Sequence, residues 1–224
     1  FDELKALEAE TGLKFNGSPT QKVGATIQSS LKKVKHNHPM LSLAKSTDNE
    51  EIKKFIGEQP VVFMLKCDGL TCSLLYKKGK LVRAETRGDG FIGEDVTENI
   101  KMVSNVPLTI SEQDEIVVDG EIIVKWDAFN QANCSDDFSH PRNYAAGGIR
   151  QLDTQVTKDR NLSFIAWKYV KGETLTNSFE NNLNILSDLG FEVVPHKFYG
   201  KISLDELPSL FENIFTVTDE RSVE

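Results

Sequence analysis

The sequence predicts an α+β fold in which antiparallel sheets are flanked by helices. Runs rich in β-branched and aromatic residues come in groups, short polar turns join neighbouring runs, and stretches with helical spacing separate the groups. The 224 residues contain no internal repeat. A chain of this length can bury the core of one large domain, with or without a small appendage.

An amphipathic helix is predicted at the start of the chain. Leu4 and Leu7 lie on one face of it, and Gly12 ends the pattern. Because the chain opens inside a helical pattern and without methionine, we expect it to be a fragment of a longer protein. We therefore interpret residues 1–16 as a short helical remnant and residues 17–224 as the main domain.

Two further helices are expected before the first strand. One falls somewhere in residues 20–35, where the periodicity is weak. The other runs from Asp48 to Ile56, with Thr47 as its N-cap. From Val61 onward the strand patterns dominate.

The remaining elements follow from the same patterns. Predicted strands cover residues 61–66, 71–76, 80–86, 107–110, 115–124 and 162–170, with a short hairpin connection at Lys77–Gly79. Predicted helices cover residues 93–101, 125–133, 179–189 and 203–215. The strand at 61–66 is apolar without a break until its final lysine, so we expect it to be buried on both faces.

The composition is that of a soluble globular protein, with 39% hydrophobic and 27% charged residues. No apolar run approaches the roughly 20 residues of a transmembrane helix, and the N-terminus has no signal-peptide pattern, so we expect a cytoplasmic protein. Cys67, Cys72 and Cys134 are an odd number without C-x-x-C spacing, which argues against a disulfide framework and a zinc site. The net charge of −8 predicts that this segment alone binds DNA poorly.

Lys66 ends the apolar run and is followed by Asp68 and Gly69. A lysine at the end of a strand commonly reaches solvent, and four-residue patterns recur by chance. The alternative is a nucleophilic lysine, desolvated enough to lose its proton near neutral pH.

Two later stretches carry more polar and glycine residues than packing alone would need. Thr86–Gly90 follows a predicted strand, its two glycines let the backbone approach a ligand, and Arg87 offers a planar fork to phosphate; an ordinary turn is the alternative. Asp119 and Glu121 alternate to the same face of a predicted strand. Paired carboxylates suit a ribose hydroxyl or a divalent cation, although a solvent-facing acidic edge has the same pattern.

A third stretch, residues 140–153, holds Arg142 and Arg150 with small residues between them. Small residues allow close approach to a flat or phosphate-bearing group. His36 and His38 are interpreted as surface or packing histidines, because nothing at i+3 or i+4 completes a metal-binding set.

Taken in order, these stretches resemble the adenylation domain of NAD-dependent DNA ligases over most of the chain. Lys66–Gly69 resembles the K-x-D-G nucleophile motif, and residues 86–99 resemble T-R-G-D-G-x-x-G-E-D-V-T-x-N. Residues 141–153 resemble P-R-N-x-A-A-G-S-L-R-Q-L-D, and His36 with Pro39–Leu43 resembles the segment that leads into the domain. K-x-D-G alone also fits ATP-dependent ligases and capping guanylyltransferases, whereas the long P-R-N-x-A-A-G run belongs to the NAD branch.

The resemblance implies that Lys66 attacks the α-phosphorus of NAD, releases nicotinamide mononucleotide and forms lysyl-AMP. The AMP would then pass to the 5′-phosphate of nicked double-stranded DNA before the nick is sealed. The attack needs a neutral amine, and the resemblance implies that burial, Arg87, Arg142 and a Mg²⁺ ion favour that form.

Roles follow from the resemblance by position. The implied catalytic residues are Lys66, Asp68, Arg87 and Glu121. The residues implied to bind NAD are Ser42, Leu43, Leu65, Lys66, Arg87, Glu121, Arg142 and Arg150, and Glu121 is implied to hold Mg²⁺. Residues 1–16 resemble the tail of the small N-terminal domain that binds the nicotinamide mononucleotide half.

The chain also departs from the family pattern. Met64 stands where the family usually has a glutamate that contacts the adenine amino group, and a thioether does not replace that acceptor. Ala44, Lys45 and Gly148 depart as well, so we expect a divergent or paralogous branch. Residues 1–224 stop before the later lysine motifs of the family, so we expect this segment to hold the nucleophile without sealing DNA.

Two alternatives remain open at this point. One is a nucleotidyltransferase of the same superfamily that acts on RNA, and the other is a catalytically silent nucleotide-binding module. In each case we expect a monomer that does not associate with a membrane.

Overall fold

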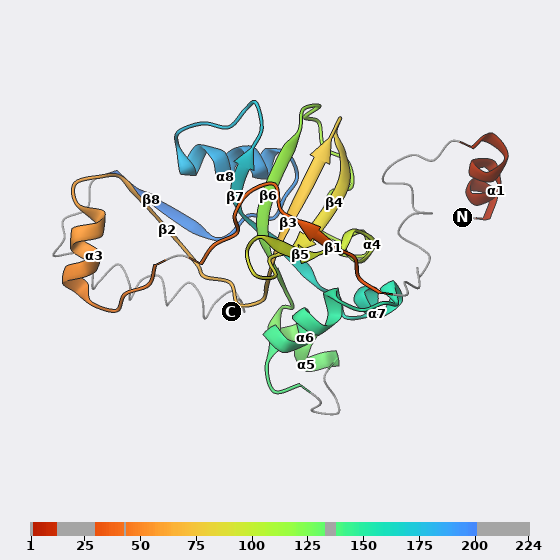
Figure 1. Ribbon diagram of the computed structural model, residues 1–224, viewed down its shortest axis with the longest axis horizontal. Coiled ribbons are helices and arrows are strands. Elements are labelled where there is room, and N and C mark those ends of the chain that lie inside the picture. Colours follow the sequence, from red (N-terminus) through yellow and green to blue (C-terminus); the bar gives the residue numbers. More distant parts are fainter. Residues whose placement is uncertain (1, 13–29, 43, 133–137, 201–224) are drawn as a thin grey trace.

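The computed structural model describes residues 2–12, 30–42, 44–132 and 138–200 (Figure 1). Leu43 and the predicted helix at residues 203–215 lie outside these ranges, as does most of the stretch in which a helix was expected at residues 20–35. None of the helices described is long and apolar enough to cross a membrane. The described residues form helices and antiparallel sheets, so the predicted α+β class is confirmed.

A four-stranded antiparallel sheet forms the centre of the molecule. Its order is β4-β3-β6-β7, with strands β3 (Leu70–Lys77), β4 (Lys80–Thr86), β6 (Ile116–Ile123) and β7 (Ser163–Lys171). All four were predicted to within a residue or two at each end. The β3–β4 turn contains Lys78 and Gly79, both with positive φ (51° and 67°), which is the conformation that a tight hairpin requires.

Two short antiparallel pairs accompany the central sheet. β1 (Lys33–Lys35) pairs with β5 (Ile92–Glu94), and β2 (Val61–Met64) pairs with β8 (His196–Tyr199). All four residues of β2 are only half-buried, so the expectation of a strand buried on both faces was wrong. The reason is that β2 belongs to a two-stranded ribbon, whereas a strand buried on both faces is an internal strand of a covered sheet.

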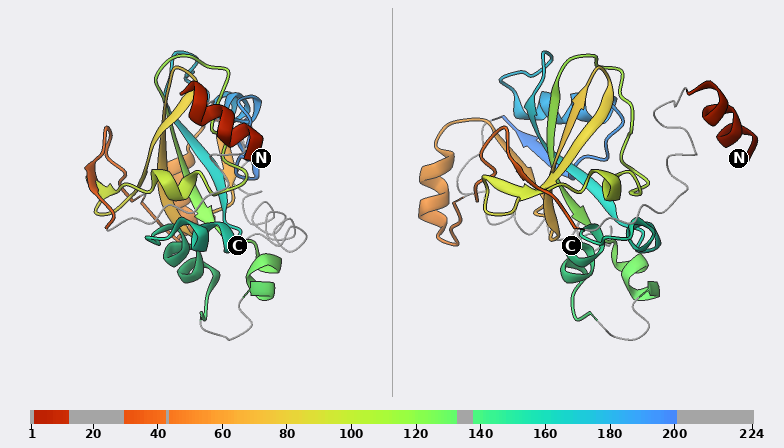
Figure 2. Two further views of the ribbon diagram at one scale, coloured as in Figure 1. Left: turned by 90° about the vertical axis from the view of Figure 1, so that its right-hand side faces the viewer. Right: turned by 45° about the vertical axis from the view of Figure 1, so that its right-hand side comes forward.

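Helices surround the sheets (Figures 1 and 2). α8 packs on β7, and α6 packs on β6, toward opposite ends of the central sheet in Figure 1, while α1 lies apart from the sheet in that view. Their bounds are α1 (Asp2–Thr11), α3 (Asn49–Ile56), α4 (Thr97–Ile100), α5 (Trp126–Ala132), α6 (Pro141–Ile149), α7 (Thr154–Asp159) and α8 (Phe179–Asp188).

Several predicted boundaries need correction. The N-cap of α3 is Asp48, whose side chain accepts hydrogen bonds from Glu50 N and Glu51 N, and it is not Thr47. The helix predicted at residues 93–101 is shorter, because its beginning is strand β5. Residues 107–110 form no strand, although Thr109 makes an isolated bridge to Lys80.

The largest buried side chains of the central sheet share one of its faces. Leu74 and Tyr76 of β3, Ile122 of β6 and Phe164 of β7 are fully buried. The Tyr76 hydroxyl donates a hydrogen bond to the Pro107 carbonyl (2.7 Å), which satisfies the polar end of a buried aromatic ring. This core makes the end of the sheet near Glu121 a rigid platform for the polar residues described next.

Candidate active site

Lys66 lies in the loop that joins β2 to β3, and its side chain is exposed. The loop is held on one side by the Leu65 amide, which donates to the Pro195 carbonyl (3.0 Å). On the other side, a Cβ added to Gly69 would lie 2.0 Å from the Ile122 carbonyl oxygen of β6. Glycine is therefore required at the end of K-x-D-G, because the loop backbone rests directly on the central sheet.

We expected the Lys66 amine to be buried, but the Lys66 side chain is exposed. The next residue, Cys67, is buried instead. Burial, assisted by the Glu121 carboxylate, raises the pKa of the Cys67 thiol to about 11. The thiol therefore stays protonated near neutral pH, and Lys66 is the more accessible of the two side chains.

Glu121 on β6 is the residue around which the predicted site residues gather. Burial raises the pKa of its carboxyl, and a hydrogen bond from Thr71 and the charges of Lys66, Arg142 and Arg87 act in the opposite direction. Four residues predicted from separate stretches of the sequence thus lie close enough to interact electrostatically. Three basic side chains thus act electrostatically on one half-buried carboxylate.

Asp68 and Arg142 form the second connection across the site. Arg142 Nη1 donates to Asp68 Oδ1 (3.1 Å), and His140 Nδ1 lies 3.9 Å from Asp68 Oδ2. Arg142 belongs to the first turn of α6, whose N-cap His140 accepts a hydrogen bond from the Arg142 amide. The Lys66 loop and the start of α6, which are distant in sequence, are joined here.

Arg87 is presented by a turn that two glycines make possible. Gly88 and Gly90 have φ of 55° and 95°, the left-handed region that favours glycine. The Arg87 amide donates to the Thr71 carbonyl (3.0 Å). Hydrogen bonds from the Ile92 and Phe91 amides lower the pKa of the exposed Asp89 carboxyl, so this residue stabilises the turn as an anion.

Arg150 is held differently from the other arginines. Its guanidinium makes a two-pronged contact with Glu94, in which Nη2 donates to Oε1 (2.9 Å) and Nε donates to Oε2, and this contact raises the pKa of Arg150. In addition, Asn99 Nδ2 donates to the Gln151 carbonyl (2.8 Å). These two contacts join residues 86–99 to residues 141–153, the two longest motif stretches of the sequence.

The other predicted NAD-binding residues are less constrained. Ser42 is exposed, Leu65 is half-buried, and Leu43 lies outside the described residues. Met64 is half-buried on β2, where its register partner is His196 of β8.

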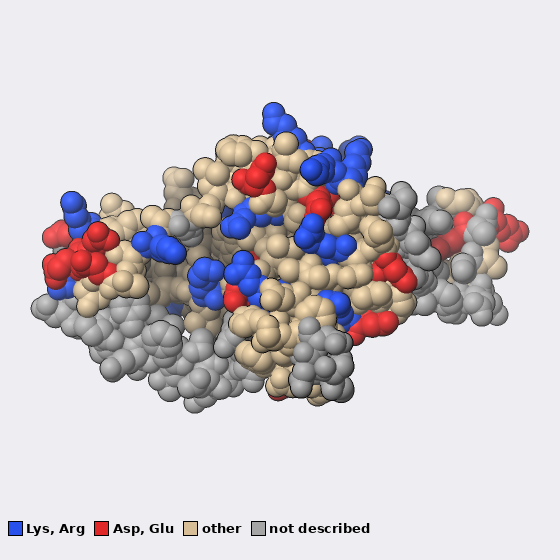
Figure 3. All heavy atoms as spheres, turned by 60° about the horizontal axis from the view of Figure 1, so that its bottom comes forward, with Lys and Arg blue, Asp and Glu red and all other residues tan. Residues whose placement is uncertain are grey.

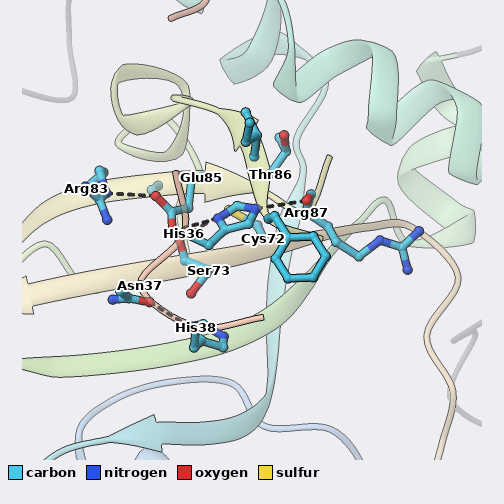
Figure 4. A network of polar contacts seen from close by, with 12 residues as sticks. His36, Asn37, His38, Cys72, Ser73, Arg83, Glu85, Thr86 and Arg87 are labelled. Carbon is cyan, nitrogen blue, oxygen red and sulfur yellow. Dashed lines mark hydrogen bonds and ion pairs between the residues drawn. The ribbon is translucent and has the colours of Figure 1, made fainter. Parts of the chain in front are cut away.

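Sequence reasoning missed the contacts of His36 and His38 (Figure 4). His36 is buried, and its ring contacts Glu85 of β4 and the Arg87 carbonyl, each at 2.9 Å. His38 Nε2 lies 2.9 Å from Oδ2 of Asp119. Asp119 and Glu121 share a face of β6 as predicted, yet Asp119 is bound by a histidine. The available signal was the acidic side chains placed inside apolar strands, which require partners.

No group of three His, Cys, Asp or Glu side chains within the described ranges lies close enough to hold a metal ion. Magnesium, however, is commonly bound by one or two carboxylates together with substrate phosphates and water. Glu121 fits that mode as a single carboxylate close to the lysine. Figure 3 also shows Lys and Arg side chains along the middle of one face, so the acidic excess of the chain is not uniform.

Known proteins are similar to this chain over most of its length. A family model described as the NAD-dependent DNA ligase adenylation domain matches residues 28–222. The chain is 37% identical to a DNA ligase of Lachnoclostridium phytofermentans over 98% of its own length, and 35% identical to one of Ruminiclostridium cellulolyticum, also over 98%. It is 40% identical over 94% of its length to a DNA ligase of Metamycoplasma arthritidis. The matches cover 34% to 35% of these relatives, so the chain spans about a third of their length.

Proposed function

Because the chain belongs to the family of NAD-dependent DNA ligase adenylation domains, we propose that Lys66 takes AMP from NAD as the first step of DNA ligation. The observation that carries this proposal is the meeting of Lys66, Arg87 and Arg142 around Glu121. A nucleophile surrounded by cations is the arrangement that phosphoryl transfer needs, because that reaction depends mostly on positioning and on neutralising phosphate charge.

The adenylation step balances as follows. Nζ of Lys66 forms a bond to the α-phosphorus, the bond from that phosphorus to the bridging oxygen breaks, and nicotinamide mononucleotide leaves with the electron pair. The amine gives up its proton to water, which reaches the exposed side chain. Arg87 and Arg142 bind the phosphates and neutralise charge in the transition state.

The remaining residues orient the substrate. Glu121 accepts a hydrogen bond from a ribose hydroxyl, and Asp68 holds Arg142 in place through their ion pair (3.1 Å). Ser42, Leu43 and Leu65 lie beside the adenosine, and Arg150 contacts phosphate when it leaves Glu94. A Mg²⁺ ion held by Glu121 would supply further charge neutralisation at the phosphates.

We extend the proposal to the whole reaction. The AMP passes to the 5′-phosphate of nicked double-stranded DNA, breaking the phosphorus–nitrogen bond, and the adjoining 3′-hydroxyl then displaces it, as replication and repair require. Residues 1–16 end a separate nicotinamide mononucleotide-binding unit, and residues 17–224 form the adenylation unit. The protein works as a cytoplasmic monomer.

Incubation with NAD is expected to add one AMP to the protein, as measured by intact mass. Lys66→Ala should abolish the adduct because it removes the nucleophile, whereas Lys54→Ala, an exposed lysine of α3, should leave it unchanged. Peptide mapping should place the AMP on Lys66 and not on the protonated Cys67 thiol.

Other outcomes separate the alternatives. An adduct formed only with ATP or GTP would contradict the NAD assignment. Transfer of AMP to RNA ends but not to nicked DNA would favour an RNA-directed enzyme. Tight binding of NAD without an adduct would favour a silent nucleotide-binding module, for which Met64 on β2 is the motivating residue.

A further inference from the structure

The segment from His36 to Met40, called the strap below, lies across one face of the central sheet (Figure 4). His36 Nδ1 lies 2.9 Å from Oε1 of Glu85 on β4, and His38 Nε2 lies 2.9 Å from Oδ2 of Asp119 on β6. Ser73 of β3 lies between these two carboxylates, since it is in register with both. The strap is therefore fixed to the sheet at two points, with one strand between them.

Both anchoring carboxylates are buried. Glu85 is 3% and Asp119 is 2% exposed. Glu85 has a second side-chain partner, because Arg83 Nε lies 2.8 Å from its Oε2. Asp119 has one side-chain partner among the described residues, His38, and its Oδ1 accepts no hydrogen bond within them. A buried carboxylate is costly unless it is paired, so Asp119 depends on His38 more than Glu85 depends on His36.

The same strap also binds the turn that presents Arg87. The His36 amide donates to the Phe91 carbonyl and the Met40 amide donates to the Gly90 carbonyl, both at 2.9 Å. The His36 ring Nε2 contacts the Arg87 carbonyl at 2.9 Å, and because a carbonyl only accepts, this nitrogen carries a proton. Three carbonyls of the turn are thus held by strap groups.

The strap continues directly into the segment with Ser42. A shift of the strap would therefore displace two elements together, the Arg87 turn and the residues proposed to lie beside the adenosine. Neither His38 nor Asp119 needs to touch the nucleotide for this to happen. A displacement of about 1 Å in such supporting elements can cost an enzyme on the order of a hundredfold in rate.

We propose that His38 is a positioning residue, which through its contact with buried Asp119 fixes the strap and so sets the Arg87 turn and Ser42 for binding NAD. The inference rests on the proposed function and names a residue outside the nucleotide site that sets the affinity for NAD. His38 acts on the binding of NAD more than on the bond-forming step, because Lys66 is held by different contacts, those of Leu65 and Gly69.

The test compares His38→Phe with Lys171→Gln, which breaks an ion pair to Glu115 at the far end of β6 and β7. In single-turnover formation of lysyl-AMP, His38→Phe should raise the half-saturating NAD concentration about tenfold and change the maximal rate by less than about threefold. Lys171→Gln should leave both unchanged. An unchanged half-saturating concentration in His38→Phe would overturn the proposal.

Two further variants separate positioning from general destabilisation. His38→Gln keeps one N–H donor for Asp119 and should stay within about threefold of the unmodified protein. The double variant His38→Phe/Asp119→Asn removes the unpaired buried charge, so it should recover the melting temperature without recovering NAD affinity. Recovery of both, or a His38→Gln variant as impaired as His38→Phe, would show that the contact with Asp119 does not position the strap.

Hydrogen exchange gives a readout that does not need activity. The Met40 amide, bonded to the Gly90 carbonyl, should exchange faster in His38→Phe than in Lys171→Gln. If no NAD adduct forms in the unmodified protein, the proposed function fails while this measurement still decides whether His38 holds the strap. Equal Met40 exchange in the two variants would contradict the inference.

Discussion

Glu121→Gln is expected to slow formation of lysyl-AMP by about a hundredfold, because the hydrogen bond proposed between Glu121 and a ribose hydroxyl is weakened and positioning decides the rate. The carboxylate is the centre of the cluster of Lys66, Arg87 and Arg142, and a neutral amide no longer balances their charges. Single-turnover measurements at saturating NAD check the rate. A rate within about threefold of the unmodified protein would remove Glu121 from the catalytic group.

The same variant should be more stable than the unmodified protein at neutral pH. Burial raises the pKa of Glu121 in the folded state above its unfolded value, so stability from this group is present below the unfolded pKa and lost as pH rises through the folded pKa. A glutamine at position 121 does not ionise, so the stability of the variant does not fall in this way as pH rises. The difference in melting temperature should therefore shrink as pH falls and disappear well below the unfolded glutamate pKa of about 4.3, where both side chains are neutral in the folded and unfolded chains.

Glu115→Gln is the matched control, because the pKa of Glu115 is shifted in the opposite direction to that of Glu121. Hydrogen bonds from Lys171 and Lys77 lower the pKa of Glu115 to about 2, so this carboxylate stabilises the fold above its unfolded pKa and the effect is lost as pH falls. Glu115→Gln should therefore lower the melting temperature at neutral pH and leave the adenylation rate unchanged. A loss of stability at neutral pH in Glu121→Gln as well would contradict the reasoning on burial.

Gly69→Ala is expected to destabilise the fold by at least about 3 kcal/mol, which is larger than most single substitutions cause. The added Cβ would lie 2.0 Å from the Ile122 carbonyl oxygen, and this neighbour is backbone of the central sheet, so it cannot move as a flexible side chain would. Denaturant unfolding measures the change. Any folded fraction should also lose adenylation, since the Lys66 loop must lift from β6.

Gly200→Ala is the corresponding control. No heavy atom lies within 4 Å of its added Cβ, so its free energy of unfolding should change by less than about 0.5 kcal/mol. Equal stability of the Gly69→Ala and Gly200→Ala variants would mean that the nucleophile loop does not rest on the sheet as described.

The central sheet could be predicted from the sequence because its strands have strong alternating patterns. β4 was predicted with its observed bounds, Lys80–Thr86. The short strands β1 and β8 have three and four residues, too few for a pattern to stand out. α6 was not predicted to be helical, because Gly147 and Gly148 have low helix propensity. The helix nevertheless forms, with His140 as its N-cap and Pro141 in its first turn.

Within the site, the residue types were predictable but the pairing was not. Lys66, Arg87, Glu121 and Arg142 were selected from separate stretches, and the structure brings them together. The pairs His36–Glu85 and His38–Asp119 join residues 49 and 81 positions apart in sequence. No local sequence pattern predicts a contact between residues so far apart. Burial of Lys66 was wrongly expected because the strand before it was taken as internal to a sheet.

The pairing of β2 with β8 also constrains the order in which the site can form. The Leu65 amide that holds the nucleophile loop binds the Pro195 carbonyl, and β2 finds its partner strand only at residues 196–199. During synthesis the lysine emerges long before these residues exist, so its loop has no second anchor while most of the chain is being made. Closing so long a segment is slow compared with local folding, so we expect the Lys66 loop to be one of the last parts of the molecule to reach its final position.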